Sequence, residues 1–267
     1  MHPMINIALK AARDAAEAIA HSSDRLDRIK IVEDSPSSFL TSMDFDSDKT
    51  LQYHLLKAYP DHSIDSRATG LKQGTRKDVV WLIDPLIGNR NFARGYTQFA
   101  VSLACQIDGV IQHAVVVCPM TNEEFVASRG GGAQLNSRRL RVGRETELVA
   151  GSLVGLNGEA EEADTLLAMQ RAVFAIGARP RISGCTALDI VSTAADRLQG
   201  GWSPNEGGTN HSVKAAALIL KEAGGLIGSE LASPDIADAR ELLFSNPKIF
   251  KQLVKLRQAK ADSEAPR

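Results

Sequence analysis

The stretch Trp81-Leu-Ile-Asp-Pro-Leu-Ile-Gly-Asn-Arg-Asn-Phe92 decides the fold of this chain. It starts inside a short apolar run, residues 79–83, whose length and bulky side chains are typical of a buried strand. Asp84 follows directly, so its carboxylate is expected at the carboxyl end of that strand. Open α/β sheets bind their ligands at this edge. The stretch therefore predicts an α/β protein with a functional site beside Asp84.

The rest of the chain alternates between helical and strand patterns. Helices are predicted for residues 4–19, 46–59, 164–176, 187–198, 211–223 and 247–259. Strands are predicted for residues 99–107, 110–118, 123–128, 133–136, 150–156, about 181, 226–227 and 242–245, with turns at 34–38, 108–109 and 130–132. No internal repeat or low-complexity linker interrupts the pattern. We expect one domain over residues 1–267, with a flexible tail from about residue 260.

Bulk composition limits the classes of function. The 267 residues include 31 Lys and Arg against 32 Asp and Glu, so no global charge attracts nucleic acid or an anionic membrane. The first residues lack a secretory signal pattern, and no apolar run approaches the roughly 18 residues of a membrane span. Cys105, Cys118 and Cys185 are too far apart for a zinc motif, so buried, reduced thiols are expected. A cytoplasmic protein without membrane contact is predicted.

Two motifs resemble the inositol monophosphatase family. Residues 81–92 are similar to its W-x-I-D-P-[LI]-D-G-T-x-N-F signature, and residues 211–225 to its W-D-x-A-A-G-x-x-I-x-x-E-A-G-G signature. The first eight residues, the length and the Pro119-Met-x-Asn-Glu stretch look most like the bacterial SuhB-like branch. The resemblance implies a layered α-β-α-β-α sandwich, a Mg²⁺-dependent inositol-phosphate phosphatase ancestry and a homodimer. It also implies a partnership with transcription antitermination proteins.

The resemblance places a Mg²⁺ site on Asp44, Arg67, Asp84, the backbone carbonyl of Leu86, Ile87 and Ser212. Asp44 and Asp84 match the family. Arg67 stands where the family has a glutamate, and Ile87 and Ser212 each stand where it has an aspartate. Asn89 replaces the threonine that helps to orient the attacking water. The catalytic positions Arg67 and Asn89 are therefore degenerate.

These exchanges predict the loss of hydrolysis. Mg²⁺ requires hard oxygen ligands, and a guanidinium at Arg67 repels a cation, so Mg²⁺ binding is expected to be weak or absent. A hydrolytic metal supplies several kcal/mol of transition-state stabilisation. The chain is predicted to be a pseudophosphatase that acts by binding. The alternative is an active Mg²⁺-dependent inositol-1-phosphate phosphatase, in which Asp44 and Asp84 hold one ion, or in which Asp65, Glu206 or another carboxylate rebuilds the site.

Five residues are candidates for ligand binding: Arg67, Gly88, Asn89, Asn205 and Glu206. Arg67 is either a solvated loop residue or a clamp for a small phosphorylated ligand, since guanidinium binds such groups bidentately. The backbone N–H groups of Gly88 and Asn89 would open a helix and form an anion site. Asn205 and Glu206 lie near the family position that contacts inositol hydroxyls.

Four further polar residues have structural interpretations. His211 is expected to begin a helix as a structural residue, and Ser212 to be its N-cap. Asp189 and Asp196 are seven residues apart on one predicted helix, where they are expected to share a face and form salt bridges.

Basic residues gather in three places: Ser137–Arg144, Arg179–Arg181, and the last helix through Lys248, Lys251, Lys255 and Lys260. Such runs are usually solvated faces. Acting together, they would attract RNA or an acidic protein surface, and the binding would weaken with salt.

Overall fold

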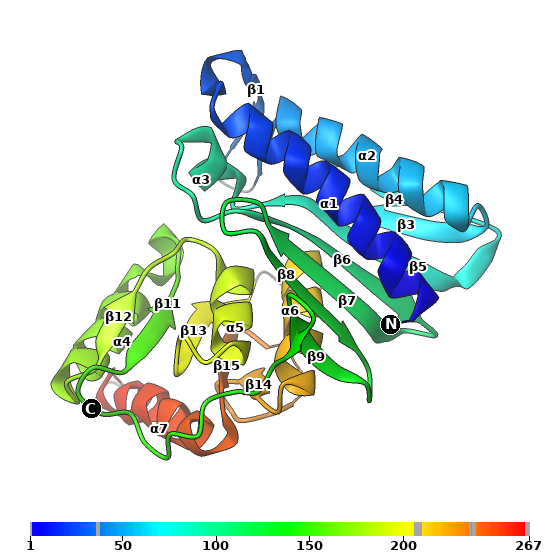
Figure 1. The fold of residues 1–267 in the computed structure, drawn as a ribbon. Helices are drawn as coiled ribbons and strands as arrows, with labels where there is room; N and C mark the ends of the chain where they lie inside the picture. Colours follow the sequence, from blue (N-terminus) through cyan, green and yellow to red (C-terminus); the bar gives the residue numbers. More distant parts are fainter. Residues whose placement is uncertain (1, 36–37, 206–209, 235, 237–238, 265–267) are drawn as a thin grey trace.

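In the computed structural model of the protein, helices and sheets alternate in layers (Figure 1). The structure describes residues 2–35, 38–205, 210–234, 236 and 239–264, with side chains to residue 258. The order of layers is α-β-α-β-α, which confirms the predicted sandwich. Within these residues, no helix is both long and apolar enough to cross a bilayer.

The larger sheet has eight strands in the order β10-β9-β8-β7-β6-β5-β3-β4. Their bounds are β3 (His62–Ser66), β4 (Gly70–Lys72), β5 (Arg76–Ile87), β6 (Ala100–Ile107), β7 (Val110–Cys118), β8 (Glu123–Ser128), β9 (Gly132–Leu135) and β10 (Arg138–Arg139). Helices α1 (Pro3–Ser23) and α2 (Ser42–Ala58) cover one face, and a short hairpin of β1 (Ile31–Asp34) and β2 (Phe39–Thr41) stands beside them (Figure 1). The short helices η1 (Leu26–Arg28) and α3 (Asn89–Ala93) complete this half.

The smaller sheet has five strands in the order β12-β11-β13-β15-β14. Their bounds are β11 (Leu153–Leu156), β12 (Arg179–Arg181), β13 (Gly200–Pro204), β14 (Leu226–Ser229) and β15 (Glu241–Ser245). Helices α5 (Thr186–Ala194) and α6 (His211–Glu222) lie between the two sheets, while α4 (Ala163–Ala175), preceded by η2 (Ala160–Glu162), and α7 (Pro247–Glu264) cover the outer face.

Strand alternation explains the layers, because successive side chains point to opposite faces of a sheet. In β7, Val115 and Val117 join the core under α1 and α2, whereas Ala114 and Val116 join the core around α5 and α6. In β15, Leu243 likewise faces α4 and α7, while its two neighbours face the middle layer. Both sheets are therefore apolar on both sides.

The predicted β6–β7 hairpin is confirmed. Asp108 and Gly109 form its two-residue turn with φ angles of 48° and 78°. Both angles lie in the left-handed region, as a type I′ turn requires. The three cysteines are free and buried, as expected.

Several element boundaries differ from the sequence prediction. Helix α2 starts at Ser42, four residues early, because its buried first turns carry polar side chains that give no apolar period. Strand β5 continues past Asp84 to Ile87, with an irregular register between the two. Helix α7 continues to Glu264, so residues 260–264 of the predicted tail are helical, and the remainder lies outside the described residues. The pattern missed β1, β2, β3, β4, β10 and β13.

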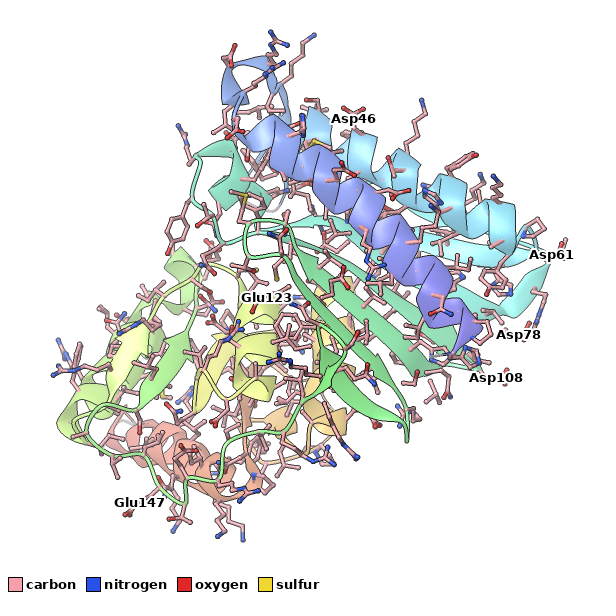
Figure 2. The ribbon with its side chains drawn as sticks, viewed as in Figure 1. Asp46, Asp61, Asp78, Asp108, Glu123 and Glu147 are labelled. Carbon is pink, nitrogen blue, oxygen red and sulfur yellow. The ribbon has the colours of Figure 1, made fainter. Side chains whose placement is uncertain are left out.

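Two adjacent glutamates of β8 connect the large sheet to helices on its opposite faces. Glu124 accepts two hydrogen bonds from Arg13 of α1, at 2.5 and 2.7 Å. Glu123, labelled in Figure 2, is paired with Arg197, which follows α5. Because neighbouring strand residues point to opposite faces, one dipeptide ties both helical layers to the same strand.

Helix α1 offers a test of close packing. Its buried face carries small residues, among them Ala12, which is fully buried, whereas Ala18 is exposed. Ala12→Leu is expected to lower the free energy of unfolding by about 1–3 kcal/mol, because added methylenes strain a full core. Denaturant unfolding measures it, with Ala18→Leu as the matched control. Equal effects of the two substitutions would contradict this packing.

Candidate functional site at the ends of β3 and β5

The amino end of α2 supplies the first acidic residue of the site. Thr41 caps this helix, and its backbone N–H and its Oγ1 both donate to Oδ2 of Asp44 at 2.8 Å. The backbone N–H of Asp44 donates in return to the Thr41 side chain, so the two residues form a capping box. Asp44 is fully buried, and its second oxygen, Oδ1, is left to accept from Arg67.

The turn after β3 presents Arg67. Its backbone N–H donates to the Ile83 carbonyl, 3.0 Å away on β5. The buried carboxylate of Asp48 holds the two sides of the turn, accepting from Ser66 Oγ at 2.5 Å and from Thr69 Oγ1 at 3.0 Å. Ser66 Oγ in turn accepts from the Ala68 N–H at 3.1 Å. Helix α2 therefore fixes both Asp44 and the turn that carries Arg67.

Arg67 bridges the two retained acidic residues. Its Nε donates to Asp84 Oδ1 at 2.7 Å, and its Nη2 donates to Asp44 Oδ1 at 2.6 Å. Nη2 also lies 3.2 Å from the carbonyl oxygen of Leu86. The guanidinium thus contacts the three oxygen donors that the family resemblance assigns to Mg²⁺. Its side chain is 29% exposed, so the expectation of a solvated loop arginine is wrong.

The electrostatics of this cluster depend on Arg67. Burial acts to lower the pKa of its guanidinium, but Asp84 and Asp44 outweigh burial and raise that pKa, so Arg67 stays charged. Burial also raises the pKa of Asp44, against the opposing effect of Arg67 and the bonds from Thr41 and Asn89. One positive charge therefore serves two carboxylates, which leaves little attraction for a further anion.

Asn89 and Ile87 are the remaining residues beside Asp44 and Asp84. Asn89 Nδ2 donates to Asp44 Oδ1 at 3.1 Å and to the carbonyl of Phe39 in β2. Gly88, with φ 71°, is the N-cap of α3, as expected for the residue that opens this helix. Ile87 is buried in the apolar cluster of the middle layer, which also holds Cys185 and Val213. The position at which the family has a second aspartate of this motif therefore carries a buried apolar side chain without an oxygen donor.

The start of α6 differs in one respect from the prediction. The N-cap is Asn210, not Ser212, since Asn210 Oδ1 accepts from the Val213 N–H and from Ser212 Oγ, both at 3.0 Å. His211 begins the helix as expected, and its Nε2 lies 3.4 Å from Asp65 Oδ1. Burial lowers the pKa of His211, which favours the neutral ring despite Asp65.

The other ligand candidates are not brought into the Arg67 cluster by any contact between described residues. Asn205 Nδ2 donates to the carbonyls of Ile236 and Ala239, at 2.8 and 2.9 Å, which is a structural role. Glu206 lies outside the described residues.

Asp189 is buried away from any paired cation in the described part of the chain. Helix α5 ends at Ala194, so Asp196 does not share its face, and the expectation of salt bridging is wrong. Asn157 Nδ2 donates to Asp189 Oδ2 at 2.8 Å. Burial raises the pKa of Asp189 to about 6, although the bonds from Ser183 and Asn157 act to lower it.

The residues present do not fit Mg²⁺. Among the described residues, no group of three or more His, Cys, Asp or Glu side chains is arranged to hold a metal ion. The two acidic residues that match the family's ligands, Asp44 and Asp84, already accept hydrogen bonds from Arg67. Ile87 supplies no donor, and Ser212 Oγ is bonded to Asn210.

Fold and sequence together define the class of protein. The model of the inositol monophosphatase family matches residues 1–261, and the chain belongs to this family. The family is generally Mg²⁺-dependent. Its Asp-Pro run and its Glu-Ala-Gly-Gly run are here residues 84–85 and 222–225.

Named relatives refine this assignment to the SuhB-like members. The chain is 39% identical to the Nus factor SuhB of Pseudomonas aeruginosa over 261 residues, which cover 95% of each chain. It is 34% identical to the Nus factor SuhB of Escherichia coli over 256 residues, again 95% of each. The crystal structure of the extragenic suppressor protein SuhB from Bartonella henselae matches with a TM-score of 0.91 and 26% identity, covering 96% of this chain and 99% of the other. An inositol monophosphatase from Thermotoga maritima, at 24% identity, a TM-score of 0.87 and coverage of 98% and 99%, supports the fold.

Removing the guanidinium tests its role in stability. Arg67→Met is expected to lower the free energy of unfolding by about 3 kcal/mol at pH 7, because it leaves two buried carboxylates without a countercharge. The loss should shrink as pH falls, since burial raises the pKa of Asp44 and the unpaired carboxylate can then take up a proton. Arg76→Met, which breaks an exposed pair with Asp78, is the matched control and should change stability little. A variant as stable as wild type at pH 7 would contradict the bridging role.

Asp189 gives a separate pH prediction. Its native pKa of about 6 lies above the ordinary value of 3.8, so the folded state binds the proton more tightly than the unfolded state does. Stability should therefore fall by about 2 kcal/mol as pH rises from 4 to 6 through this group alone. Asp189→Asn should lack that component in urea unfolding measured across this range. If the free energies of unfolding of the two proteins change with pH in parallel, the raised pKa of Asp189 is excluded.

Proposed function

We propose that this protein is a non-hydrolytic member of the inositol monophosphatase family that acts by binding a partner. The observation that carries the proposal is the contact of the Arg67 guanidinium with Asp44, Asp84 and the Leu86 carbonyl. A cation cannot approach these oxygens while a positive group lies among them. The cleft is catalytically silent on this proposal.

The missing chemistry is specific. Metal-assisted phosphate hydrolysis needs a cation to polarise the phosphoryl oxygen and to generate a hydroxide from bound water. None of the groups contacting Arg67 replaces these functions, since both carboxylates are committed to Arg67 and Asn89 donates to Asp44. His211 is buried against Asp65 and offers no substitute for the acidic ligands that the family has at positions 67, 87 and 212.

The names of the relatives suggest the kind of partner. Two proteins 34–39% identical to this chain are Nus factors, so we propose association with transcription antitermination proteins in the cytoplasm. Exposed basic residues on β10 and α7 are compatible with RNA or an acidic protein surface: Arg138, Arg139, Lys248, Lys251 and Lys255. A homodimer is proposed from the family resemblance.

An active phosphatase is the competing function. It is favoured by family membership and by the retention of Asp44 and Asp84. It requires Arg67 to leave both carboxylates so that Mg²⁺ can enter, at the cost of exposing a buried charge arrangement.

Phosphate release decides between the two functions. Wild-type protein with Mg²⁺ and inositol 1-phosphate is expected to release no phosphate above background. The variant Arg67→Glu, Ile87→Asp, Asn89→Thr, Ser212→Asp restores the family ligands and is expected to gain Mg²⁺-dependent activity.

Circular dichroism of both proteins checks that they are folded. Wild-type turnover near that of ordinary enzymes, roughly 1 s⁻¹ or more, would overturn the proposed function. An inactive wild type beside a revived variant would support it.

A further inference from the structure

The β1–β2 hairpin depends on side chains of α2 and α3 for its position. It forms a two-stranded sheet of its own, and every residue of β1 is exposed. An isolated two-stranded hairpin is at best marginally stable in water. Its place beside α2 and α3 must therefore come from contacts with these neighbouring elements.

Asp44 is the centre of those contacts. Its Oδ2 accepts both bonds from Thr41, the last residue of β2, while its Oδ1 accepts from Arg67 and Asn89. Asn89 also donates to the Phe39 carbonyl in the same strand. Both ends of strand β2 are therefore held by hydrogen bonds, Phe39 by Asn89 and Thr41 by Asp44. The Asp44 carboxylate also binds Arg67, so it connects β2 to the guanidinium.

A second set of contacts holds the outer part of the hairpin. Arg90 Nη1 lies 3.3 Å from Asp34 Oδ1, and its Nη2 donates to the Ser35 carbonyl at 2.9 Å. The Arg90 guanidinium also lies over the Phe39 ring, 4.7 Å from its centroid. Arg90 follows Asn89 directly, so α3 presents one residue to the carboxylate and the next to the hairpin.

The bond from Arg67 holds the Asp44 carboxylate in the orientation that Thr41 needs. Arg67 Nη2 donates to Asp44 Oδ1 at 2.6 Å, which is shorter than the 3.1 Å bond from Asn89 to the same oxygen. Such a charge-assisted bond is stronger than one between neutral groups. Loss of Arg67 would therefore free one side of the carboxylate and weaken the bonds from Thr41 to its other oxygen, without removing any atom of the hairpin.

We propose that Arg67 is a positioning residue that holds the β1–β2 hairpin against α2 and α3 through Asp44, and so presents the exposed β1 strand without any bound metal. A divalent cation on Asp44, Asp84 and the Leu86 carbonyl would hold the same oxygens. The guanidinium makes that arrangement permanent. The inference rests on the proposed function in one point: both take the Arg67 guanidinium, and not a metal ion, as the positive group bound to Asp44 and Asp84.

Hydrogen exchange measured by mass spectrometry tests the proposal directly. The reporter is a peptide containing the Thr41 amide, whose N–H donates to Asp44, and a peptide from residues 100–118 reports the stability of the sheet. Wild-type exchange at the hairpin is expected to be equal in EDTA and in excess Mg²⁺. Arg67→Met should exchange at least about tenfold faster at the hairpin than wild type, with the sheet peptide changed less.

Two controls separate local from global effects. Arg76→Met removes an exposed arginine with an ion pair of its own, and should leave hairpin exchange unchanged. Arg67→Lys keeps one charge but only one donor group, so its hairpin should exchange at an intermediate rate.

Either of two results would overturn the proposal. One is a wild-type hairpin that becomes more protected when Mg²⁺ is added, because a metal would then be the ordering cation. The other is an Arg67→Met hairpin that exchanges like wild type. If Arg67→Met loses its global fold, the wild-type comparison still decides. Wild-type phosphate release with unchanged exchange in Mg²⁺ would refute the proposed function alone.

Discussion

Two buried carboxylates that share one guanidinium set the constraints on this half of the molecule. Asp44 and Asp84 come from different elements, a helix and a strand, and each would be unstable as an ion in a buried place without a countercharge. Arg67 supplies that charge from a third element. The amino end of α2, the carboxyl end of β5 and the turn after β3 therefore have one compatible arrangement, and the β2 strand follows it through Thr41.

The polar face of α2 makes this arrangement possible. Its buried residues include Asp44, Ser47 and Asp48, which bond respectively to Arg67, to the Pro85 carbonyl and to Ser66. Such a face gives up hydrophobic burial in exchange for directional bonds. Helix α1, which covers the same sheet with an alanine-rich face, supplies the close apolar packing that α2 lacks. Helix α2 thus positions the polar residues of the site, and helix α1 provides close apolar packing on the same sheet.

Sequence predicted the fold well where its signals are periodic or carry turn residues. The Asp108-Gly109 turn and the helix of residues 211–222 are of this kind. Site prediction reached the residue types but not their contacts. The departure from the acidic residues of the family signatures at Arg67 and Ile87 is visible in the sequence, whereas the direction of the Arg67 side chain depends on the turn that Asp48 holds. The spacing of Thr41 and Asp44 was a usable capping signal, but the burial that raises the pKa of Asp189 is a tertiary property without a local pattern.

The burial of Ile87 among apolar neighbours has a consequence for the history of the chain. Returning an aspartate to this position alone would bury a third acidic group where there is no cation to balance it. Returning a glutamate at Arg67 first would put three carboxylates together. Each single step lowers stability before any ligand set is complete, so natural selection acting on one substitution at a time meets a barrier.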